Sequence, residues 1–407
     1  MRYEGDNMMD VKRTNRSAVM RILHEMGGMS RKRMAENIKL TPAAITKIVG
    51  ELIEDGIVRE GQALPSGGAG RREVLVELDL QAFCALGIHL NRRQAILSAV
   101  WLDGSVIFSE KQILPDFAPA EETVERLCAR LMELTAEKGL EREKILGAGV
   151  AVRGATAADG ESVRNSYGAL DTKDYPLVRR VEELTGLPAV MANNVRALLA
   201  AQMFLARETE LSSQFFLRCE DGIGAALSID NQIWRGDNEQ CSEIGHIPVI
   251  LRGGKPCSCG KSGCLETIAS PSAMREDALA ILSEERTPVL WKRMRGRDPA
   301  SLHVEDVLEA ARHGDAEVAA IVDRAVSSLA QALKAVIYVI DPAKIVLYGR
   351  LFESDYYLAR LLSEMREGVD AGHTVPIEKS KYNGKLEESA AALLAVEAFY
   401  KNGGMME

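Results

Sequence analysis

Three cysteines stand within eight residues of one another, at Cys257, Cys259 and Cys264, and His246 precedes the first of them by eleven positions. Three thiolates and one imidazole suit a closed tetrahedral Zn²⁺ site, and the glycines inside the motif CSCGKSGC let the chain turn tightly between ligands. The alternative is that these are reduced cysteines packed as small hydrophobic side chains, but the Pro, Gly, Lys and Ser around them are not typical of a core. The sequence therefore predicts a compact loop around one structural zinc ion, with no open position for catalysis.

The size and composition of the chain are those of an ordinary globular protein. With 407 residues it is too long for one small core, which predicts two or three domains. No run of about 18 apolar residues occurs, and the N-terminal residues lack the apolar stretch of a signal peptide. Seven cysteines are an odd number for a disulfide framework. We therefore expect a cytoplasmic protein with no membrane segment.

Charge is distributed unevenly along the chain, whose formal net charge is -9. Residues 11–72 contain 12 Lys or Arg and 6 Asp or Glu, a net charge of +6. Residues 73–407 contain 37 Lys or Arg and 50 Asp or Glu, a net charge of -13. A basic N-terminal part on an acidic body is typical of a DNA-binding module joined to a domain that binds a small molecule.

Residues 11–78 have the pattern of a winged helix-turn-helix. A first helix is predicted over Asn15–Met26, where apolar residues recur at helical spacing. Ser30 can cap a short second helix, and Thr41 can cap a third that has Pro42 at its first position. Two short helices joined by a short turn are typical of a helix-turn-helix, whose second helix enters the major groove of double-stranded DNA.

The predicted third helix has small, mostly uncharged side chains on its exposed face, as a helix that enters the major groove needs. The candidate reading surface consists of Thr41, Ala43, Ala44, Thr46 and Lys47. Behind this helix, a glycine-rich loop between two predicted strands ends in Arg71 and Arg72, which would form a wing that reaches DNA phosphates or the minor groove. The alternative is a small helical dimerisation module with a solvated basic face.

From residue 83 onward the chain resembles the ROK family, which comprises repressors, open reading frames and sugar kinases. The most specific stretches are EIGHIPV at 243–249 and CSCGKSGCLETIAS at 257–270. EDGIGAALSIDNQIWRG at 220–236 is similar to the family's second phosphate-binding turn, and DPAKIVLYG at 341–349 to its adenosine-binding turn. Together with the helix-turn-helix, the resemblance covers nearly the whole chain and indicates the family's transcriptional regulators.

The resemblance implies an α/β fold with two lobes, actin-like (ribonuclease H-like), that bind a sugar in the cleft between them. The alternation of apolar strand-like segments with helical stretches agrees with this fold class. We expect the first lobe at residues 80–192 and the second, with the zinc site, at 193–385. The helix near 386–401 is expected to return to the first lobe.

The resemblance also implies which residues contact the sugar, and carboxylates and amides suit neighbouring hydroxyl groups. By family position the candidates are Asn193, Asn194, Glu243, His246 and Glu266, with Gly154 and Asn165 from a more divergent segment. In the family the histidine binds zinc through one ring nitrogen and the sugar through the other, so that the metal orients the ring. Capping or surface exposure is the alternative for the two glutamates.

Three departures from the family's kinases argue against catalysis. The Asp-x-Gly-Gly-Thr pattern of their phosphate loop is replaced by residues 89–93, His-Leu-Asn-Arg-Arg. Asn194 stands at the position of the catalytic base, and an amide cannot accept a proton at neutral pH. The adenosine turn, usually rich in glycine, reads Tyr348-Gly349-Arg350, although the Gly222–Gly224 turn remains.

The sequence therefore predicts a sugar-responsive, DNA-binding transcriptional regulator that is not an enzyme, most simply a repressor of carbohydrate-utilisation genes. Its expected partners are a double-stranded DNA operator, a sugar or sugar-phosphate effector, and a second copy of the chain in a homodimer or dimer of dimers. One alternative is a sugar kinase with an N-terminal regulatory DNA-binding domain. Another is a zinc-dependent scaffold without a ligand.

Overall fold

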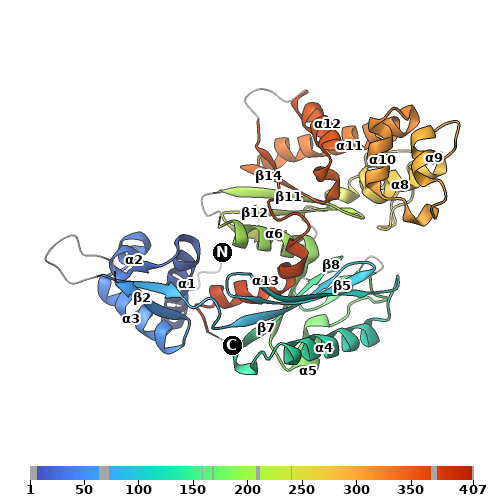
Figure 1. Ribbon diagram of the computed structural model, residues 1–407. Helices are drawn as coiled ribbons and strands as arrows, with labels where there is room; N and C mark the ends of the chain where they lie inside the picture. The colour runs from blue at the N-terminus through green and yellow to red at the C-terminus, as the bar shows by residue number, and fades with distance from the viewer. Residues whose placement is uncertain are drawn as a thin grey trace. The chain divides into compact units, whose positions relative to one another are not determined.

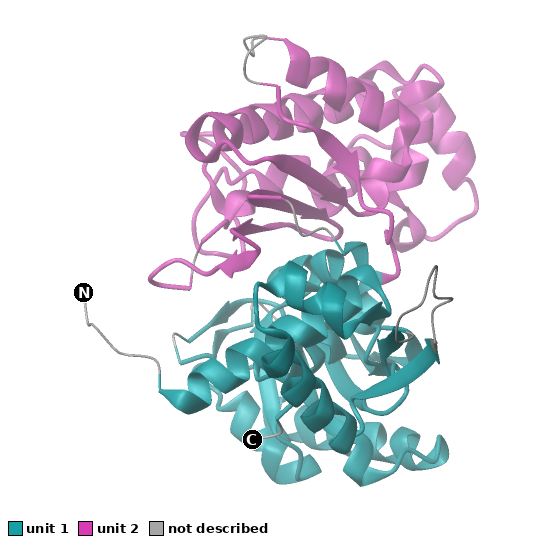
Figure 2. Ribbon diagram, turned by 90° about the vertical axis from the view of Figure 1, so that its left-hand side faces the viewer, with its two compact units in different colours: residues 1–209, 386–407 teal, residues 210–385 magenta. Residues whose placement is uncertain are grey.

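The computed structural model describes residues 7–63, 73–157, 159–166, 169–207, 211–239, 241–367 and 374–405. The chain forms two compact units, the first made of Met1–Thr209 with Leu386–Glu407 and the second of Glu210–Lys385 (Figure 2). The chain thus leaves the first unit once and returns to it for its last helix. Over the described ranges, no helix is long and apolar enough to cross a membrane.

The N-terminal part of unit 1 packs helices against a small antiparallel sheet of order β1-β3-β2 (Figure 1). Its elements are α1 (Met8–Met26), β1 (Met29–Ser30), α2 (Arg31–Ile38), α3 (Pro42–Glu54), β2 (Val58–Ala63) and β3 (Val74–Leu78). Ser30 accepts a hydrogen bond from the Arg33 amide at 3.4 Å, and Thr41 accepts one from the Ala44 amide at 3.2 Å. Both predicted caps are therefore confirmed. The first helix begins at Met8, earlier than the sequence predicted.

The rest of unit 1 is built on a five-stranded sheet of order β10-β7-β4-β5-β6, in which β4, β7 and β10 are parallel and β5 and β6 antiparallel. The strands are β4 (Cys84–Leu90), β5 (Gln94–Trp101), β6 (Val106–Ile113), β7 (Ile145–Val152) and β10 (Ala189–Asn193). Helix α13 (Leu386–Lys401) packs against the sheet and against α6 (Asn194–Ala206). A side chain at Gly149 of β7 would overlap the Ala391 carbonyl, so glycine permits this close approach of helix and sheet.

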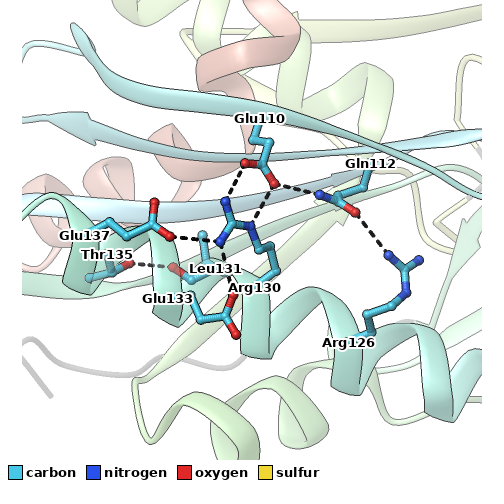
Figure 3. A network of polar contacts seen from close by, with 8 residues as sticks. All are labelled: Glu110, Gln112, Arg126, Arg130, Leu131, Glu133, Thr135 and Glu137. Atoms are coloured by element: carbon cyan, nitrogen blue, oxygen red, sulfur yellow. Dashed lines mark hydrogen bonds and ion pairs between the residues drawn. The ribbon is translucent and has the colours of Figure 1, made fainter.

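Two further helices of this part, α4 (Ala120–Glu137) and α5 (Leu177–Thr185), pack against each other and complete a core with the same sheet. A charged network joins α4 to the edge strand β6 (Figure 3). Arg130 of α4 lies 2.8 Å from Glu110 of β6, and also pairs with Glu133 and Glu137 at 3.1 and 3.0 Å. The network is solvent-accessible, so its main effect is to orient α4 rather than to add much stability.

Unit 2 has a second five-stranded sheet, of order β13-β12-β11-β14-β15, with an apolar core between it and its helices. The strands are β11 (Ser213–Cys219), β12 (Ile223–Ile229), β13 (Gln232–Trp234), β14 (Lys344–Tyr348) and β15 (Ile377–Lys379). The helices are α7 (Glu266–Ala269), α8 (Pro271–Ala280), α9 (Pro288–Met294), α10 (Val304–Arg312), α11 (Ala316–Ile340) and α12 (Asp355–Arg366). Each unit thus combines a mixed sheet with covering helices, as the expected fold class requires.

Candidate functional site

The predicted metal ligands meet in unit 2. The ligand atoms of His246, Cys257, Cys259 and Cys264 all lie within 4.8 Å of one another. The loop that carries the cysteines is folded on itself, because the Cys257 amide donates to the Lys261 carbonyl at 2.8 Å. Gly260 and Gly263 both have positive φ, at 86° and 73°, as expected for glycines in tight turns.

The spacing of these atoms fits a tetrahedral zinc site. Two sulfurs bound to one Zn²⁺ at about 2.3 Å in tetrahedral geometry lie about 3.8 Å apart. The Cys259 and Cys264 sulfurs are 3.7 Å apart, and the Cys257 sulfur is 3.4 Å from Nδ1 of His246. Burial raises the pKa of the Cys264 thiol to about 12, so a divalent cation is what would hold it as a thiolate at neutral pH. The residues present therefore fit a structural zinc ion.

The predicted sugar-contacting glutamates of unit 2 lie on either side of this loop in the sequence. Glu243 directly precedes the short 3-10 turn that ends in His246, and its Oε2 lies 3.9 Å from Nε2 of that ring. Glu266 opens α7, and its Oε2 accepts a hydrogen bond from the Ile223 amide at 2.9 Å. This bond fixes the Glu266 carboxylate at the start of β12, a role that the sequence did not reveal.

The predicted residues of unit 1 form a second group. Asn193 donates to the Gly154 carbonyl at 2.8 Å, while its Oδ1 accepts from the Val195 amide at 2.9 Å and caps α6. Gly154 has φ 111°, and a side chain there would overlap the Asn165 carbonyl. Asn193, Gly154 and Asn165 are therefore neighbours. Sequence reasoning missed that the Asn193 side chain is also a helix cap, although an Asn before a helical segment is a known signal for one.

Asn194, which the sequence resemblance places at the catalytic-base position, is buried and donates to the side-chain oxygen of Asn91 at 3.2 Å. Asn91 itself stands in the segment that replaces the phosphate loop. Its neighbours Arg92 and Arg93 both pair with Asp116, at 3.0 and 2.9 Å. This region of the chain thus has a buried amide pair and two long cationic side chains. Asn91 is a partner of Asn194 that sequence reasoning did not identify.

The segment that resembles the adenosine turn contains β14, whose last residue is Tyr348. Tyr348 is buried and packs on Phe216, with ring centroids 5.7 Å apart, so its side chain belongs to the core rather than to the surface of the turn. Arg350 is half exposed and lies 3.2 Å from the Glu220 carboxylate. Of the two bulky residues noted in the sequence, only Arg350 could therefore obstruct a nucleotide.

The candidate DNA-reading residues lie at the start of α3. Thr41, Ala43, Thr46 and Lys47 are exposed and Ala44 is half-buried. The opposite side of the helix is buried, with Ile45, Val49 and Leu52 fully inaccessible to solvent. The candidate reading residues therefore lie on the exposed side of a helix whose other side packs in the core. Arg71 and Arg72 of the predicted wing lie outside the described residues.

Comparison with known proteins agrees with this organisation. The sequence profile of the ROK family matches residues 87–396, and a profile for winged helix-turn-helix DNA-binding domains matches residues 13–59. Among curated proteins, the chain is 27% identical over 391 residues to the N-acetylglucosamine repressor of Escherichia coli O157:H7. That alignment covers 94% of this chain and 93% of the relative.

Solved structures share the fold. A ROK family transcriptional regulator, a homologue of the E. coli Mlc protein, superposes with a TM-score of 0.78 at 22% identity, covering 97% of this chain and 98% of that one. A ROK family glucokinase from Streptomyces griseus, in complex with glucose and AMPPNP, superposes with a TM-score of 0.66 at 22% identity, covering 77% and 99%. The fold is therefore a winged helix-turn-helix followed by the two-lobed, actin-like domain that ROK regulators share with sugar kinases.

Proposed function

The chain belongs to the ROK family, and from this premise we propose that it is a sugar-responsive transcriptional regulator, a repressor of carbohydrate-utilisation genes, with no kinase activity. It acts in the cytoplasm on a double-stranded operator, and a sugar or sugar phosphate is its effector. Residues 11–78 bind DNA. Residues 80–192 with 386–401, and 193–385, are the two lobes that bind the effector.

The observation that carries this proposal is the hydrogen bond between Asn194 and Asn91. Sugar phosphorylation needs a base that removes the hydroxyl proton and a loop that accommodates phosphates. An amide held in a buried pair does not take up a proton, and the asparagine and arginines of residues 91–93 replace a glycine loop. Binding without turnover is what a sensor requires, since the ligand then shifts an equilibrium instead of being consumed.

The proposed effector contacts are the residues that the family resemblance indicates. Glu243, His246 and Glu266 of unit 2 would accept or donate hydrogen bonds to sugar hydroxyls, as would Asn193 and Asn194 of unit 1, together with the segment of Gly154 and Asn165. A zinc ion held by His246 Nδ1 and three cysteine sulfurs would fix the tautomer and orientation of the imidazole. Its Nε2, on the side of Glu243, would then be directed at the ligand.

On DNA, α3 is proposed to enter the major groove with Thr41, Ala43, Ala44, Thr46 and Lys47, supported by Arg71 and Arg72 of the wing. One helix-turn-helix contacts few base pairs, so specificity over a genome requires two half-sites and therefore a homodimer or a dimer of dimers. The half-sites would be separated by about 34–36 Å or a multiple of it.

The experiment that tests this function asks whether the chain acts as a transcriptional regulator or as a sugar kinase. The purified chain is incubated with ATP and glucose, xylose or N-acetylglucosamine, and in parallel used to select duplexes from a random-sequence library. We expect no sugar-dependent ADP formation and enrichment of a palindromic sequence. Turnover above about 1 s⁻¹, in the usual kinase range, would favour the sugar kinase with an N-terminal regulatory domain.

A further inference from the structure

The segment that follows α13, Asn402–Met405, packs against the DNA-binding part of unit 1. Nε of Arg16 on α1 donates to the Gly403 carbonyl at 2.6 Å, and Arg16 is 2% exposed. This bond joins positions that are 387 residues apart in the chain. We call Asn402–Met405 the post-α13 turn.

Two glycines permit this packing. Gly403 has φ 65°, and a side chain there would lie 2.7 Å from the Arg13 carbonyl and 2.8 Å from Cβ of Arg16. Gly404 has φ 76°, and a side chain there would overlap Ile57, at the end of the turn behind α3. Larger residues at either position would push the turn away from α1, because the obstacles at Gly403 are backbone and Cβ atoms that cannot rotate aside.

The same arginine reaches the DNA-reading helix. Its guanidinium lies 2.6 Å from Asp55, the C-terminal cap of α3, and 3.4 Å from Glu51 in the last turn of α3. Carboxylates at a helix C-terminus are unfavourable next to the negative end of the helix dipole, and a buried cation offsets this. Arg16 thus bonds the post-α13 turn and the end of α3 with one rigid, planar group.

The helices that precede and follow unit 2 in the chain, α6 and α13, both contact α1. The chain enters unit 2 soon after α6 and returns at Leu386, the first residue of α13. The His24 ring of α1 donates to the Phe204 carbonyl near the end of α6 at 3.1 Å. Arg21 of α1 pairs with Glu397 of α13 at 3.0 Å, and Figure 1 labels the three helices. A displacement of α6 or α13 would therefore change the contacts that hold α1 in place.

We propose that the post-α13 turn, clamped by Arg16, transmits the effector signal from α13 to α3, and that Arg16 is the positioning residue of this switch. The inference rests on the proposed function. The Arg16 side chain is buried and is not among the proposed DNA or sugar contacts. It connects the end of α3 to the turn that follows α13, the helix through which the chain returns from unit 2. Loss of the clamp leaves both binding sites intact and uncouples them.

The test compares full-length variants in operator binding by fluorescence anisotropy. The DNA is the duplex selected by the wild-type chain, and the effector is whichever of N-acetylglucosamine, glucose, xylose or their phosphates raises its melting temperature. The variants are Arg16→Ala, Arg16→Lys and Gly403→Ala, the last of which displaces the turn without changing charge. Arg13→Ala is the control, because this residue pairs with Asp10 on the same helix.

The readout is the ratio of operator Kd with and without sugar. For the wild type and Arg13→Ala we expect a ratio in the range of allosteric couplings, about 5- to 150-fold. For Arg16→Ala and Gly403→Ala we expect this ratio to fall to within about twofold of unity, with sugar affinity retained. For Arg16→Lys we expect a ratio between that of the wild type and that of Arg16→Ala. If the clamp only stabilises the fold, its loss would lower the melting temperature of the variants and leave the ratio of operator Kd values unchanged.

The possible results separate the two proposals. A wild-type ratio retained in Gly403→Ala and in a folded Arg16 variant overturns the transmission role alone. If Arg16→Ala does not fold, Arg16→Lys and Gly403→Ala decide the matter. A wild-type chain that selects no duplex, or whose DNA affinity no sugar changes, overturns the proposed function and the switch with it.

Discussion

His246 presents its two ring nitrogens to different neighbours. Nδ1 faces the cysteine sulfurs, 3.4 Å from Cys257, whereas Nε2 lies 3.9 Å from Glu243. A metal on Nδ1 would leave Nε2 protonated, hence a hydrogen-bond donor, and would prevent the ring from turning. In the proposed function, the metal site and the effector site would therefore share the His246 side chain, and loss of the metal should weaken effector binding.

Replacing Cys259 by Ser tests this link. We expect the wild-type chain to contain one zinc per chain and the variant to lose it, with sugar affinity weakened by about 10- to 100-fold, the usual cost of disturbing a metal ligand's support. Metal analysis and calorimetric sugar titration measure the two effects. Cys241→Ser, which lies outside the cluster, is the matched control. Wild-type sugar affinity in a metal-free variant would refute the coupling.

His24 predicts a pH dependence of stability. Burial lowers the pKa of its ring, and this effect outweighs the hydrogen bond to the Phe204 carbonyl, which raises the pKa because it uses a proton on Nε2. The folded state therefore takes up a proton on His24 less readily than the unfolded chain, whose histidine becomes protonated below about pH 6.5. The free energy of unfolding should therefore fall as the pH drops below this value, by at most about 1.4 kcal/mol per pH unit from this group.

Urea unfolding of the wild type and of His24→Gln, which keeps an N–H donor but does not titrate, measures this contribution. The difference between the two curves removes the effects of the other histidines. We expect the stability of the wild type to fall more steeply than that of the variant as the pH drops below about 6.5. Parallel curves would show that folding does not lower the pKa of His24.

At the scale of elements, the predictions that depended on local chemistry were accurate. The caps of α2 and α3 were predicted from Ser30 and Thr41 because a cap is a contact between near neighbours in sequence. The start of α1 was predicted too late, at Asn15 instead of Met8. The apolar residues of its first turns, Met8, Met9 and Val11, are exposed and form no buried stripe. These turns have a capping box between Asn7 and Asp10, which hydrophobic periodicity does not detect.

The exposed start of α3 leads to a prediction for Lys47→Ala. If Lys47 contacts a base edge, the variant should bind the selected duplex about 5- to 150-fold more weakly, the equivalent of about 1–3 kcal/mol, and should tolerate substitutions at one base pair. Lys138→Ala, which removes one exposed positive charge after α4, is the control for net charge. An equal loss in both variants would mean that Lys47 acts only through its charge.

At the scale of the whole molecule, the sequence predicted the order of parts and the fold class, because the family resemblance extends over both lobes. The metal ligands were predicted as a set, and the structure brings the four together. The second roles of Asn193 and Glu266 could not be predicted, since they depend on where the Gly154 carbonyl and the Ile223 amide lie in space. The effector contacts and the lobe boundaries stay predictions.

The central claim is that a bound sugar, which is not turned over, changes the affinity for DNA. The most direct measurement is fluorescence anisotropy of the selected duplex with the wild type, Glu243→Ala and the exposed control Glu276→Ala, each with and without the sugar that raises the wild-type melting temperature. We predict that all three bind DNA equally without sugar, and that the sugar changes Kd for the wild type and Glu276→Ala but not for Glu243→Ala. A full response in Glu243→Ala would contradict the proposed effector site, and an unchanged wild-type Kd with sugar bound would contradict the claim itself.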